Sequence, residues 1–337
     1  MNLIYNNDDI NFDITKNTIF LAGPTSRINC HDSWRKNASK YLEEFGFNGN
    51  IIIPEPKNCI VSNNIDKNTQ IEFERQYLSM SNIILFWIPR NNSELIGLTT
   101  NIEFGEWYNS NKVVVGFPDD SIKNDYIKYI IDENNLDFYN NLEELCKISV
   151  DKLNRNPKVW FTSDTHYNQS RAYLLTKRPF LSLKQMNQIM ISNHNSKVYS
   201  QDTIYHLGDF GEAIYFQYLS GNDYNLLLGN YDNEKFVSEI KSIDIYNRLT
   251  IISNNTLFED MNLIHEPEFG INENIFHLYD HIHKHFVKTN GVNVGVDTHC
   301  FYPIDLETVY FYKNAINNFY DKNVFLSTID NNSLIIV

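Results

Sequence analysis

Short apolar runs that stop abruptly at a glycine, a proline or a polar residue recur along this chain of 337 residues. Near the N-terminus they cover residues 18–22, 51–53, 83–87 and 113–115, and segments with helical spacing of apolar residues lie between them, at residues 34–45, 70–80 and 102–109. Short buried strands that alternate with helices form a parallel sheet with helices on both faces. We therefore predict an α/β fold whose ligands bind at the carboxyl ends of the strands.

A polar segment with a helical pattern, residues 119–156, separates two such series of strands. It ends in Asn154-Arg155-Asn156-Pro157, and a new apolar run begins at residue 158. The second series continues with VWFTSDTH, TIYHLGDF, YNLLLGNYD and LIHEPE. Because the chain is longer than one typical domain, we predict two domains, at residues 1–154 and 157–337.

Composition excludes several classes of protein. Apolar residues make up 42% of the chain, but no run approaches the ~18 apolar residues of a membrane helix. The net charge of −14 argues against tight binding to a nucleic acid backbone, which depends on Lys and Arg. Residues 1–16 lack the basic-then-apolar order of a signal peptide, so we expect a cytoplasmic protein. Reduced thiols are expected for the four cysteines, which form no CxxC pair: Cys30, Cys59, Cys146 and Cys300.

Histidines concentrate in the second half, where nine of the ten follow Pro157. Several stand beside Asp or Asn directly after an apolar run, where a parallel sheet would present them together. Imidazole nitrogens with carboxylate and amide oxygens suit Mn²⁺, Fe or Zn²⁺. A single DxH or HxH motif is as often a surface or core feature as a ligand, so the ordered series carries the prediction. The candidate metal ligands are Asp164, His166, Asp209, Asn230, His265, His281 and His283.

The order DxH, GD, GN, H and HxH resembles the calcineurin-like metallophosphoesterase family from about residue 158 to the C-terminus. The resemblance implies a four-layer α/β/β/α sandwich with two divalent metal ions, Mn²⁺ first and Fe, Zn²⁺ or Ni²⁺ as alternatives. It implies one ion on Asp164, His166 and His283, the other on Asn230, His265 and His281, and Asp209 as the bridge. Such a pair, ~3.5–4 Å apart, activates water and neutralises charge on phosphoryl oxygens.

Two positions depart from that family's usual pattern. Tyr231 stands where a histidine usually assists the leaving group or the transition-state charge, followed by an acid that is Asp232 here. A tyrosine hydroxyl donates a hydrogen bond but is a weaker acid near neutrality. Asp280 replaces the glycine before the last histidine pair. Neither change removes a ligand, so we expect metal binding with an altered rate or substrate choice, and Tyr231 and Asp232 are catalytic candidates.

The remaining histidines are interpreted as non-catalytic. His206 is expected to be structural. The roles of His194, His277, His285 and His299 are left open, with a non-catalytic role favoured for each. The segment Arg178-Pro179-Phe180 and residues 293–297 are interpreted mainly as scaffold.

The N-terminal motifs IFLAGP, Trp34-Arg35, QIEFE and TNIEFGEW resemble the nucleoside 2-deoxyribosyltransferase-like family over about residues 18–118. The resemblance implies a flavodoxin/Rossmann-like parallel sheet with flanking helices. It implies Glu103 as nucleophile on the anomeric carbon, Glu74 as a second carboxylate, and Gly23 and Pro24 as the loop against the substrate, with Trp107 or Trp87 as a stacking surface. A close carboxylate stabilises or captures the oxocarbenium-like charge left when a base departs.

These acidic residues also allow a non-catalytic interpretation. Glu103 and Glu106 could be the acidic first turn of a helix, favoured by its dipole, and Glu74-Arg75 could be a solvated face. Asn82 and Gly97 replace acids common in the family, with Glu94 near the second position. Simple binding of a sugar or nucleotide, or hydrolysis of the glycosidic bond, therefore remains open beside base exchange.

Together the two halves predict a bifunctional enzyme that acts on a nucleoside or nucleotide. One alternative is a metallophosphoesterase regulated by a non-catalytic, nucleotide-sensing N-terminal domain. Another, a degenerate scaffold, conflicts with seven retained ligand positions whose mutual charge is costly without metal. The resemblance to the transferase family further implies a homo-oligomer.

Overall fold

The computed structural model describes residues 1–6, 12–26, 33–57, 67–91, 95–267, 274–284, 287–288 and 290–317. By the proximity of its Cα atoms the chain divides into two compact units, Met1–Asn156 and Pro157–Val337. Four residues of the sequence analysis lie outside the described residues: Cys30, Cys59, Glu94 and His285. Cys146 is a buried free thiol and Cys300 an exposed one.

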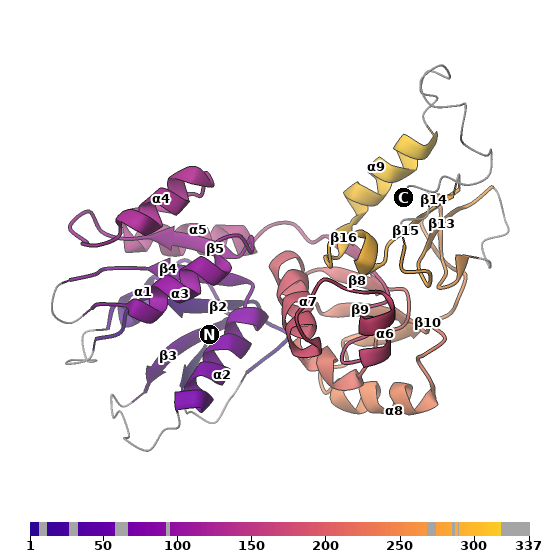
Figure 1. Cartoon of the computed structure of the whole chain (residues 1–337), viewed down its shortest axis with the longest axis horizontal. Coiled ribbons are helices and arrows are strands. Elements are labelled where there is room, and N and C mark those ends of the chain that lie inside the picture. The colour runs from indigo at the N-terminus through magenta and orange to yellow at the C-terminus, as the bar shows by residue number, and fades with distance from the viewer. Residues whose placement is uncertain are drawn as a thin grey trace. The chain divides into compact units, whose positions relative to one another are not determined.

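A six-stranded parallel sheet forms the centre of the first unit (Figure 1). The strands lie in the order β1 (Asn2–Asn6), β3 (Asn50–Pro56), β2 (Thr18–Ala22), β4 (Ile83–Trp87), β5 (Val113–Gly116) and β6 (Phe138–Tyr139). β2 and β4 are buried along their whole length, as strands covered on both faces are. The predicted parallel sheet is confirmed.

Helices flank this sheet. α1 (Trp34–Glu44) packs against α5 (Leu142–Leu153), and the ion pair Arg75–Glu106 joins α2 (Lys67–Met80) to α3 (Leu98–Trp107). The chain moves one way along the sheet from β2 to β3 and the other way from β3 to β4, so right-handed crossovers put α1 and α2 on opposite faces. The carboxyl ends of β2 and β4 therefore form a switch point, where α/β sheets bind ligands. α4 (Asp125–Glu133) connects β5 to β6.

Three elements of this unit differ from the predictions for local reasons. β1 was not predicted, because it is Asn-rich and lacks the apolar run by which the other strands were recognised. It pairs on one side only, with β3. β3 continues through Pro54 because its pairing with β2 has ended at Ile52, so the missing amide costs no bond on that side. The polar segment of residues 119–156 contains, besides two helices, the short edge strand β6.

The second unit contains two five-stranded sheets. The first has the order β10 (Leu249–Ile252), β9 (Asp223–Leu227), β8 (Thr203–His206), β7 (Val159–Thr162) and β16 (Ile304–Asp305), parallel except for β16. The second has the order β11 (Thr256–Phe258), β12 (Met261–Leu263), β13 (Phe276–Tyr279), β15 (Gly291–Asn293) and β14 (Val287–Lys288), antiparallel only at its two edges.

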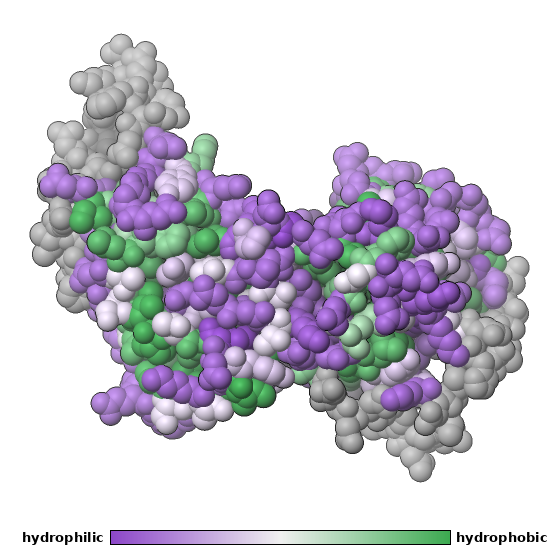
Figure 2. All heavy atoms as spheres, turned by 180° about the vertical axis from the view of Figure 1, so that it is seen from behind, coloured by the Kyte–Doolittle hydropathy of each residue, from purple (hydrophilic) through white to green (hydrophobic). Residues whose placement is uncertain are grey.

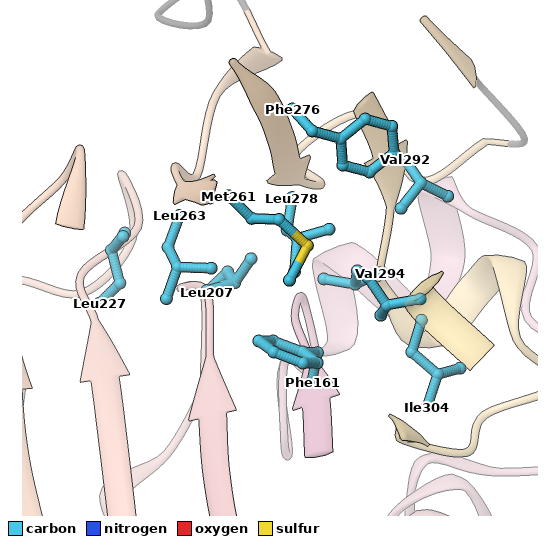
Figure 3. Packing of buried hydrophobic residues seen from close by; sticks show 11 residues of the cluster. Phe161, Leu207, Leu227, Met261, Leu263, Phe276, Leu278, Val292, Val294 and Ile304 are labelled. Carbon is cyan, nitrogen blue, oxygen red and sulfur yellow. The ribbon is translucent and has the colours of Figure 1, made fainter. Parts of the chain in front are cut away.

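Side chains of both sheets meet in one hydrophobic core (Figure 3). Phe161 and Leu207 come from the first sheet and its strand ends, and Leu263 and Leu278 from the second, all fully buried. Burial at roughly 25 cal/mol per Å² makes this core the main force that joins the sheets. It thereby fixes the carboxyl ends of β7, β8, β12 and β13 near one another.

The remaining elements of this unit are helical. They are α6 (Ser170–Leu175), α7 (Leu183–Lys197), α8 (Glu234–Ile243), α9 (Leu306–Asn317) and the 3₁₀ helices Ala213–Tyr218 and Val296–Thr298. Ser182 and Asn233 cap α7 and α8 with side-chain oxygens that accept backbone N–H bonds.

The face drawn in Figure 2 is mainly hydrophilic, with apolar patches between polar side chains. Leu98 and Ile102, one turn apart on α3, are among the exposed apolar side chains. In the part of the chain that the structure describes, no helix is long and apolar enough to cross a membrane.

Candidate functional site

Five strand ends of the second unit supply the predicted metal ligands. Asp164 and His166 follow β7, Asp209 follows β8 and Asn230 follows β9, all on the first sheet. His265 follows β12, and the pair His281 and His283 follows β13, on the second sheet. The shared core between the sheets brings these ends together, so residues up to 119 positions apart in the chain meet at one edge.

Six of the seven predicted ligands form two groups that could each hold a metal ion. Asp164, His166 and His283 make one, and Asp209, His265 and His281 the other, with the ligand atoms of each group within 4.8 Å of one another. The seventh, Asn230, joins the second group, since its Oδ1 lies 3.3 Å from His265 Nε2.

Asp209 faces both groups. Its Oδ2 lies 3.7 Å from His166 Nε2, a member of the first group, and 3.5 Å from His265 Nε2, a member of the second. Its Oδ1 accepts a bond from the backbone N–H of Tyr231 at 2.9 Å. One carboxylate oxygen is thus positioned between the two sets of nitrogens, as a bridging ligand requires.

Two buried atoms of the first group have no hydrogen-bond partner among the described residues, namely Asp164 Oδ1 and His166 Nε2, which lie 3.4 Å apart. His283 Nε2 lies 3.3 Å from the same Asp164 oxygen. A buried polar atom without a partner costs about 1–3 kcal/mol. A divalent cation would satisfy these atoms together, so the residues present fit a metal ion.

Backbone strain accompanies the ligands. Five of them, Asp164, His166, Asp209, His281 and His283, have φ between 47° and 77°. Non-glycine residues rarely adopt this left-handed region, at a cost of order 1–3 kcal/mol each. The fold thus holds several ligands in costly conformations that turn their side chains toward one point.

Three imidazoles are anchored through Nδ1, which leaves Nε2 for the centre of the site. His166 Nδ1 lies 2.6 Å from Gln169 Oε1, His265 Nδ1 lies 2.8 Å from the Leu207 carbonyl oxygen, and His283 Nδ1 lies 2.7 Å from Asp297 Oδ2. Donation by Nδ1–H to these oxygens fixes the tautomer. His281 differs, because its Nδ1 faces His265 Nε2 at 3.2 Å.

Charge in the site is dense. Burial alone would raise the pKa of Asp164, but the imidazole of His166, 3.4 Å away, and the charges of His265 and His283 lower it. Burial alone would lower the pKa of His265, but its bond with Asp209 and the charges of Asp164 and Asp209 raise it to about 9. Protons and divalent cations compete for such nitrogens.

The two catalytic candidates of this half differ in position. Tyr231 is 45% exposed and its ring meets the His166 ring edge-on at 5.6 Å, so its hydroxyl can reach a molecule bound at the site. Asp232 is buried, and its oxygens accept from the backbone N–H groups of Asp209 at 2.7 Å, Gly229 at 3.0 Å and Phe210 at 3.2 Å. Its geometry is that of a support for the turn that carries Asp209.

Asp280, the residue in place of the usual glycine, is fully buried beside the ligands. A Cβ added to Gly295 would stand 1.4 Å from Asp280 Oδ2, so the carboxylate fills the space that this glycine leaves. Asn293 Nδ2 donates to Asp280 Oδ1 at 2.7 Å. Burial, with the charge of Asp164, raises the pKa of Asp280 well above its ordinary value.

In the first unit, the predicted Gly23-Pro24 loop lies at the switch point of the sheet. Gly23 has φ +150°, and a Cβ there would meet the Trp87 carbonyl oxygen at 2.1 Å. Arg35 organises the loop from α1: it donates to the Leu21 carbonyl at 2.9 Å and the Gly23 carbonyl at 2.6 Å. Arg35 is buried and forms an ion pair with Glu55 at 2.5 Å.

Glu103 and Glu74 come from α3 and α2 and are close enough to interact electrostatically, with each other and with Arg35. Burial raises the pKa of Glu103 to about 8, the charges of Glu74 and Glu106 add to the rise, and Arg35 opposes it. Burial also raises the pKa of Glu74, opposed by a bond from Gln70 and by Arg35. A half-buried carboxyl whose pKa is raised by burial and by a second carboxyl nearby is typical of catalytic acid and base pairs.

Comparison with known proteins bears on this unit. Residues 16–121 match the model of the family described as nucleoside 2-deoxyribosyltransferase like, which spans β2 to β5 with Gly23, Glu74 and Glu103. The first unit carries a nucleoside 2-deoxyribosyltransferase-like domain. The predicted resemblance over residues 18–118 is thereby confirmed.

Two further comparisons cover just under half of the chain. An uncharacterized protein of Methanocaldococcus jannaschii is 27% identical over 169 residues, 45% of this chain and 89% of that protein. A protein of unknown function from Aquifex aeolicus, known from its crystal structure, matches 47% of this chain and 100% of its own at 20% identity. Its TM-score of 0.38 is below the level at which a common fold follows.

The two tryptophans predicted as a stacking surface, Trp107 and Trp87, lie toward opposite ends of the strands. Trp107 ends α3, and the Lys112 ammonium, just before β5, lies 5.3 Å from its ring, toward the amino ends of the strands. Trp87 ends β4 and is buried. Glu106, the other acid of α3, is exposed and paired with Arg75. Because α3 begins at Leu98, neither Glu103 nor Glu106 lies in its first turn, so the first-turn interpretation is wrong. The solvated-face interpretation fits Arg75, which is exposed, but not the half-buried Glu74.

The other described histidines have ordinary partners. Burial lowers the pKa of His206 to about 3, and its Nε2 lies 2.9 Å from Thr165 Oγ1, which agrees with a structural role. His194 is buried and donates to the Ser220 carbonyl at 2.9 Å. His299 donates to the Asn293 carbonyl at 2.8 Å. His277 is buried on β13.

Sequence reasoning missed three residues that position the candidates. Glu55, the partner of Arg35, lies in the part of β3 beyond Pro54 where the predicted strand ended. Gln169 and Asp297 hold His166 and His283. A signal existed for Gln169, which follows His166 by three residues in a turn, whereas Asp297 is 14 residues from its partner and had none.

Proposed function

We propose that the second unit is a two-metal phosphoesterase of the calcineurin-like kind. The observation that carries this proposal is the meeting of six ligand-type side chains in two groups, with the carboxylate of one of the six, Asp209, facing both groups. On this proposal, residues 157–337 form a four-layer α/β/β/α domain, in which the two sheets are the inner layers.

The chain's residues would divide the work as follows. Asp164, His166 and His283 would hold one divalent cation, and Asn230, His265 and His281 the other, with Mn²⁺ first and Fe, Zn²⁺ or Ni²⁺ as alternatives. Bound ions of this kind activate water and neutralise charge on phosphoryl oxygens. The anchored Nδ1 atoms keep the imidazoles oriented, so little reorganisation is needed when substrate binds.

Tyr231 would contact the leaving side of the substrate. Its half-exposed hydroxyl donates a hydrogen bond, which stabilises a developing negative charge without full proton transfer. A leaving group whose conjugate acid has a low pKa depends little on a general acid. This arrangement therefore favours phosphoesters whose leaving group is a weakly basic oxyanion. Asp232 would act through the turn that it supports.

For the first unit we propose cleavage or transfer at the N-glycosidic bond of a nucleoside or nucleotide, in a domain of residues 1–154. A Glu103 carboxylate oxygen would bond to C1′ as the bond from C1′ to the base breaks, and the base would leave with the bonding electrons and take up a proton. Glu74, with its raised pKa, would supply that proton or hold the sugar. Gly23 and Pro24 would allow the substrate close approach, and Trp87, which ends β4 beside Gly23, would provide the stacking surface rather than Trp107. The resemblance to the family further suggests a homo-oligomer.

One observation favours a second candidate for this unit, a non-catalytic nucleotide sensor. The pKa of Glu103 is raised to about 8 in the free protein, and a protonated carboxyl is no nucleophile. The rate of base release against pH separates the candidates: a nucleophilic Glu103 gives a rate that rises as pH approaches 8, whereas a sensor gives no base release at any pH.

The decisive experiment is a paired assay on metal-stripped protein, with and without Mn²⁺, that follows phosphate and free base from nucleoside mono-, di- and cyclic phosphates. Mn²⁺-dependent phosphate release that is lost in Asp209→Asn supports the phosphoesterase. Asn tolerates the left-handed φ of 55° at this position, so this variant tests the charge with the least change to the backbone. Absence of metal-dependent hydrolysis from every substrate would refute the proposal.

A further inference from the structure

Asp297 and Arg178 form a buried pair next to one half of the metal-ligand cluster. Arg178 Nε lies 2.8 Å from Asp297 Oδ1, and Nη2 lies 2.7 Å from Oδ2, the bidentate geometry that gives arginine–carboxylate pairs their directionality. The side chains are 0% and 9% exposed. Buried pairs that contribute little net stability are often retained for the geometry they impose.

Each partner also holds a segment that carries a predicted ligand. Asp297 Oδ2 accepts from His283 Nδ1 at 2.7 Å, so His283 Nε2 is left without the proton and faces Asp164 Oδ1 at 3.3 Å. Arg178 donates to the backbone carbonyl of Asp164 at 2.6 Å and to that of Thr165 at 2.9 Å. The two ligand segments belong to different sheets, and this pair connects them through five hydrogen bonds.

The connection serves one half of the cluster only. Asp164, His166 and His283 form the first group, and two of these three are held by the pair. The second group is held in other ways: His265 Nδ1 donates to the Leu207 carbonyl, and Asp209 is held by the backbone N–H of Tyr231. Loss of the pair should therefore act on one group and spare the other.

We infer that Asp297 and Arg178 are positioning residues that set the affinity of the first metal site. Asp297 fixes the tautomer and the ring orientation of His283. Arg178 keeps the backbone carbonyls of Asp164 and Thr165 at a constant distance from Asp297, and thereby from His283. The inference rests on the proposed two-metal function. It replaces the scaffold interpretation of residues 178–180 and 293–297 with a specific role.

The test is a titration of the metal-stripped full chain with Mn²⁺ and, separately, with Co²⁺. Calorimetry measures the binding of each ion, and visible absorption reports the bound Co²⁺. The wild type should bind two ions. Asp297→Asn should weaken one of the two sites by about 10–100-fold, the usual effect of removing such a support, and change the Co²⁺ spectrum of that site. Arg178→Lys should weaken the same site, because one ammonium cannot replace a five-donor fork.

A matched control is Asp305→Asn, which removes another ion-paired carboxylate of the same unit, 2.9 Å from Lys158, away from the ligands. It should bind both ions as the wild type does. Equal weakening of both sites in Asp297→Asn, or wild-type binding at both, would overturn the inference. A wild-type protein that binds no divalent cation would instead overturn the two-metal function itself, so the two failures are distinguishable.

Discussion

The two candidate sites of this chain differ in how the fold holds their side chains. In the second unit five predicted ligand residues have left-handed backbones, and buried atoms of Asp164 and His166 lack hydrogen-bond partners among the residues that the structure describes. In the first unit Glu74 and Glu103 project from regular helices, and the fixed element is a glycine loop held by Arg35. Unsatisfied, strained groups persist where a ligand compensates them, so the second site carries its evidence in its own geometry, and the first depends more on its family match.

The largest expected effect breaks the second site. His265→Ala should reduce metal-dependent phosphate release about 1,000-fold, because a lost ligand removes several kcal/mol of transition-state stabilisation at about 1.4 kcal/mol per tenfold. His194→Ala is the matched control, a buried histidine bonded to a backbone carbonyl; it should lower stability and keep two bound metal ions per chain. Equal loss of metal in both variants would show that the cluster is only structural.

The corresponding change in the first site is Glu103→Gln. Base release should fall by about 100-fold or more, the usual share of a catalytic carboxyl, while Mn²⁺-dependent phosphate release stays unchanged. Glu106→Gln, on the same helix but exposed and paired with Arg75, should retain base release. If chromatography of the products shows the two variants to be alike, Glu103 is not the reacting group.

Metal binding should change the free energy of unfolding of the second unit and not that of the first. At 100 times its dissociation constant, Mn²⁺ should stabilise the second unit by about 2.7 kcal/mol through preferential binding to the folded state, and leave the first unit unchanged. Hydrogen exchange with and without Mn²⁺ measures this, since each unit reports through its own amides. Protection gained equally in both units contradicts the assignment.

Gly23→Ala tests the fixed element of the first site. The added Cβ meets the Trp87 carbonyl oxygen at 2.1 Å, in a conformation that L side chains rarely adopt, so unfolding free energy should fall by about 2 kcal/mol or more. Gly105→Ala, on α3, meets no atom within 4 Å and should raise it by about 0.5–1 kcal/mol. Urea denaturation compares them, and a Gly23 variant as stable as the wild type would remove the argument for a constrained loop.

The smallest expected effect concerns pH. Because the fold raises the pKa of Glu103 from 4.5 to about 8, folding favours its protonated form. The stabilising contribution is complete below pH 4.5 and is lost as pH rises through about 8. Given its partial exposure we expect a loss of about 1–2 kcal/mol, and Glu103→Gln should flatten the dependence. Parallel urea curves from pH 5 to 9 for both proteins would exclude the raised pKa.

How far the sequence predicts this molecule depends on whether a feature is local. The strand ends with their glycines and acids are local, so β2, β4 and β7 and the ligand order were readable from the chain. Partners far apart were not: Arg35 meets Glu55 across 20 residues, and Arg178 meets Asp297 across 119. The edge strands β1 and β6 were also not predicted, because a strand that pairs on one side only is less buried and need not be apolar. The raised pKa of Glu103 follows first from its burial and then from the charge of Glu74 on another helix, and neither is revealed by spacing along the chain.

The contact between Asp280 and Gly295 constrains the order in which such a chain can change. While Asp280 is present, any side chain at position 295 collides with its carboxylate at 1.4 Å, whereas a glycine at position 280 would remove that collision. A lineage can therefore gain or lose the carboxylate only while position 295 is glycine. The two positions, 15 apart in sequence, are expected to vary together, with the aspartate found only beside the glycine.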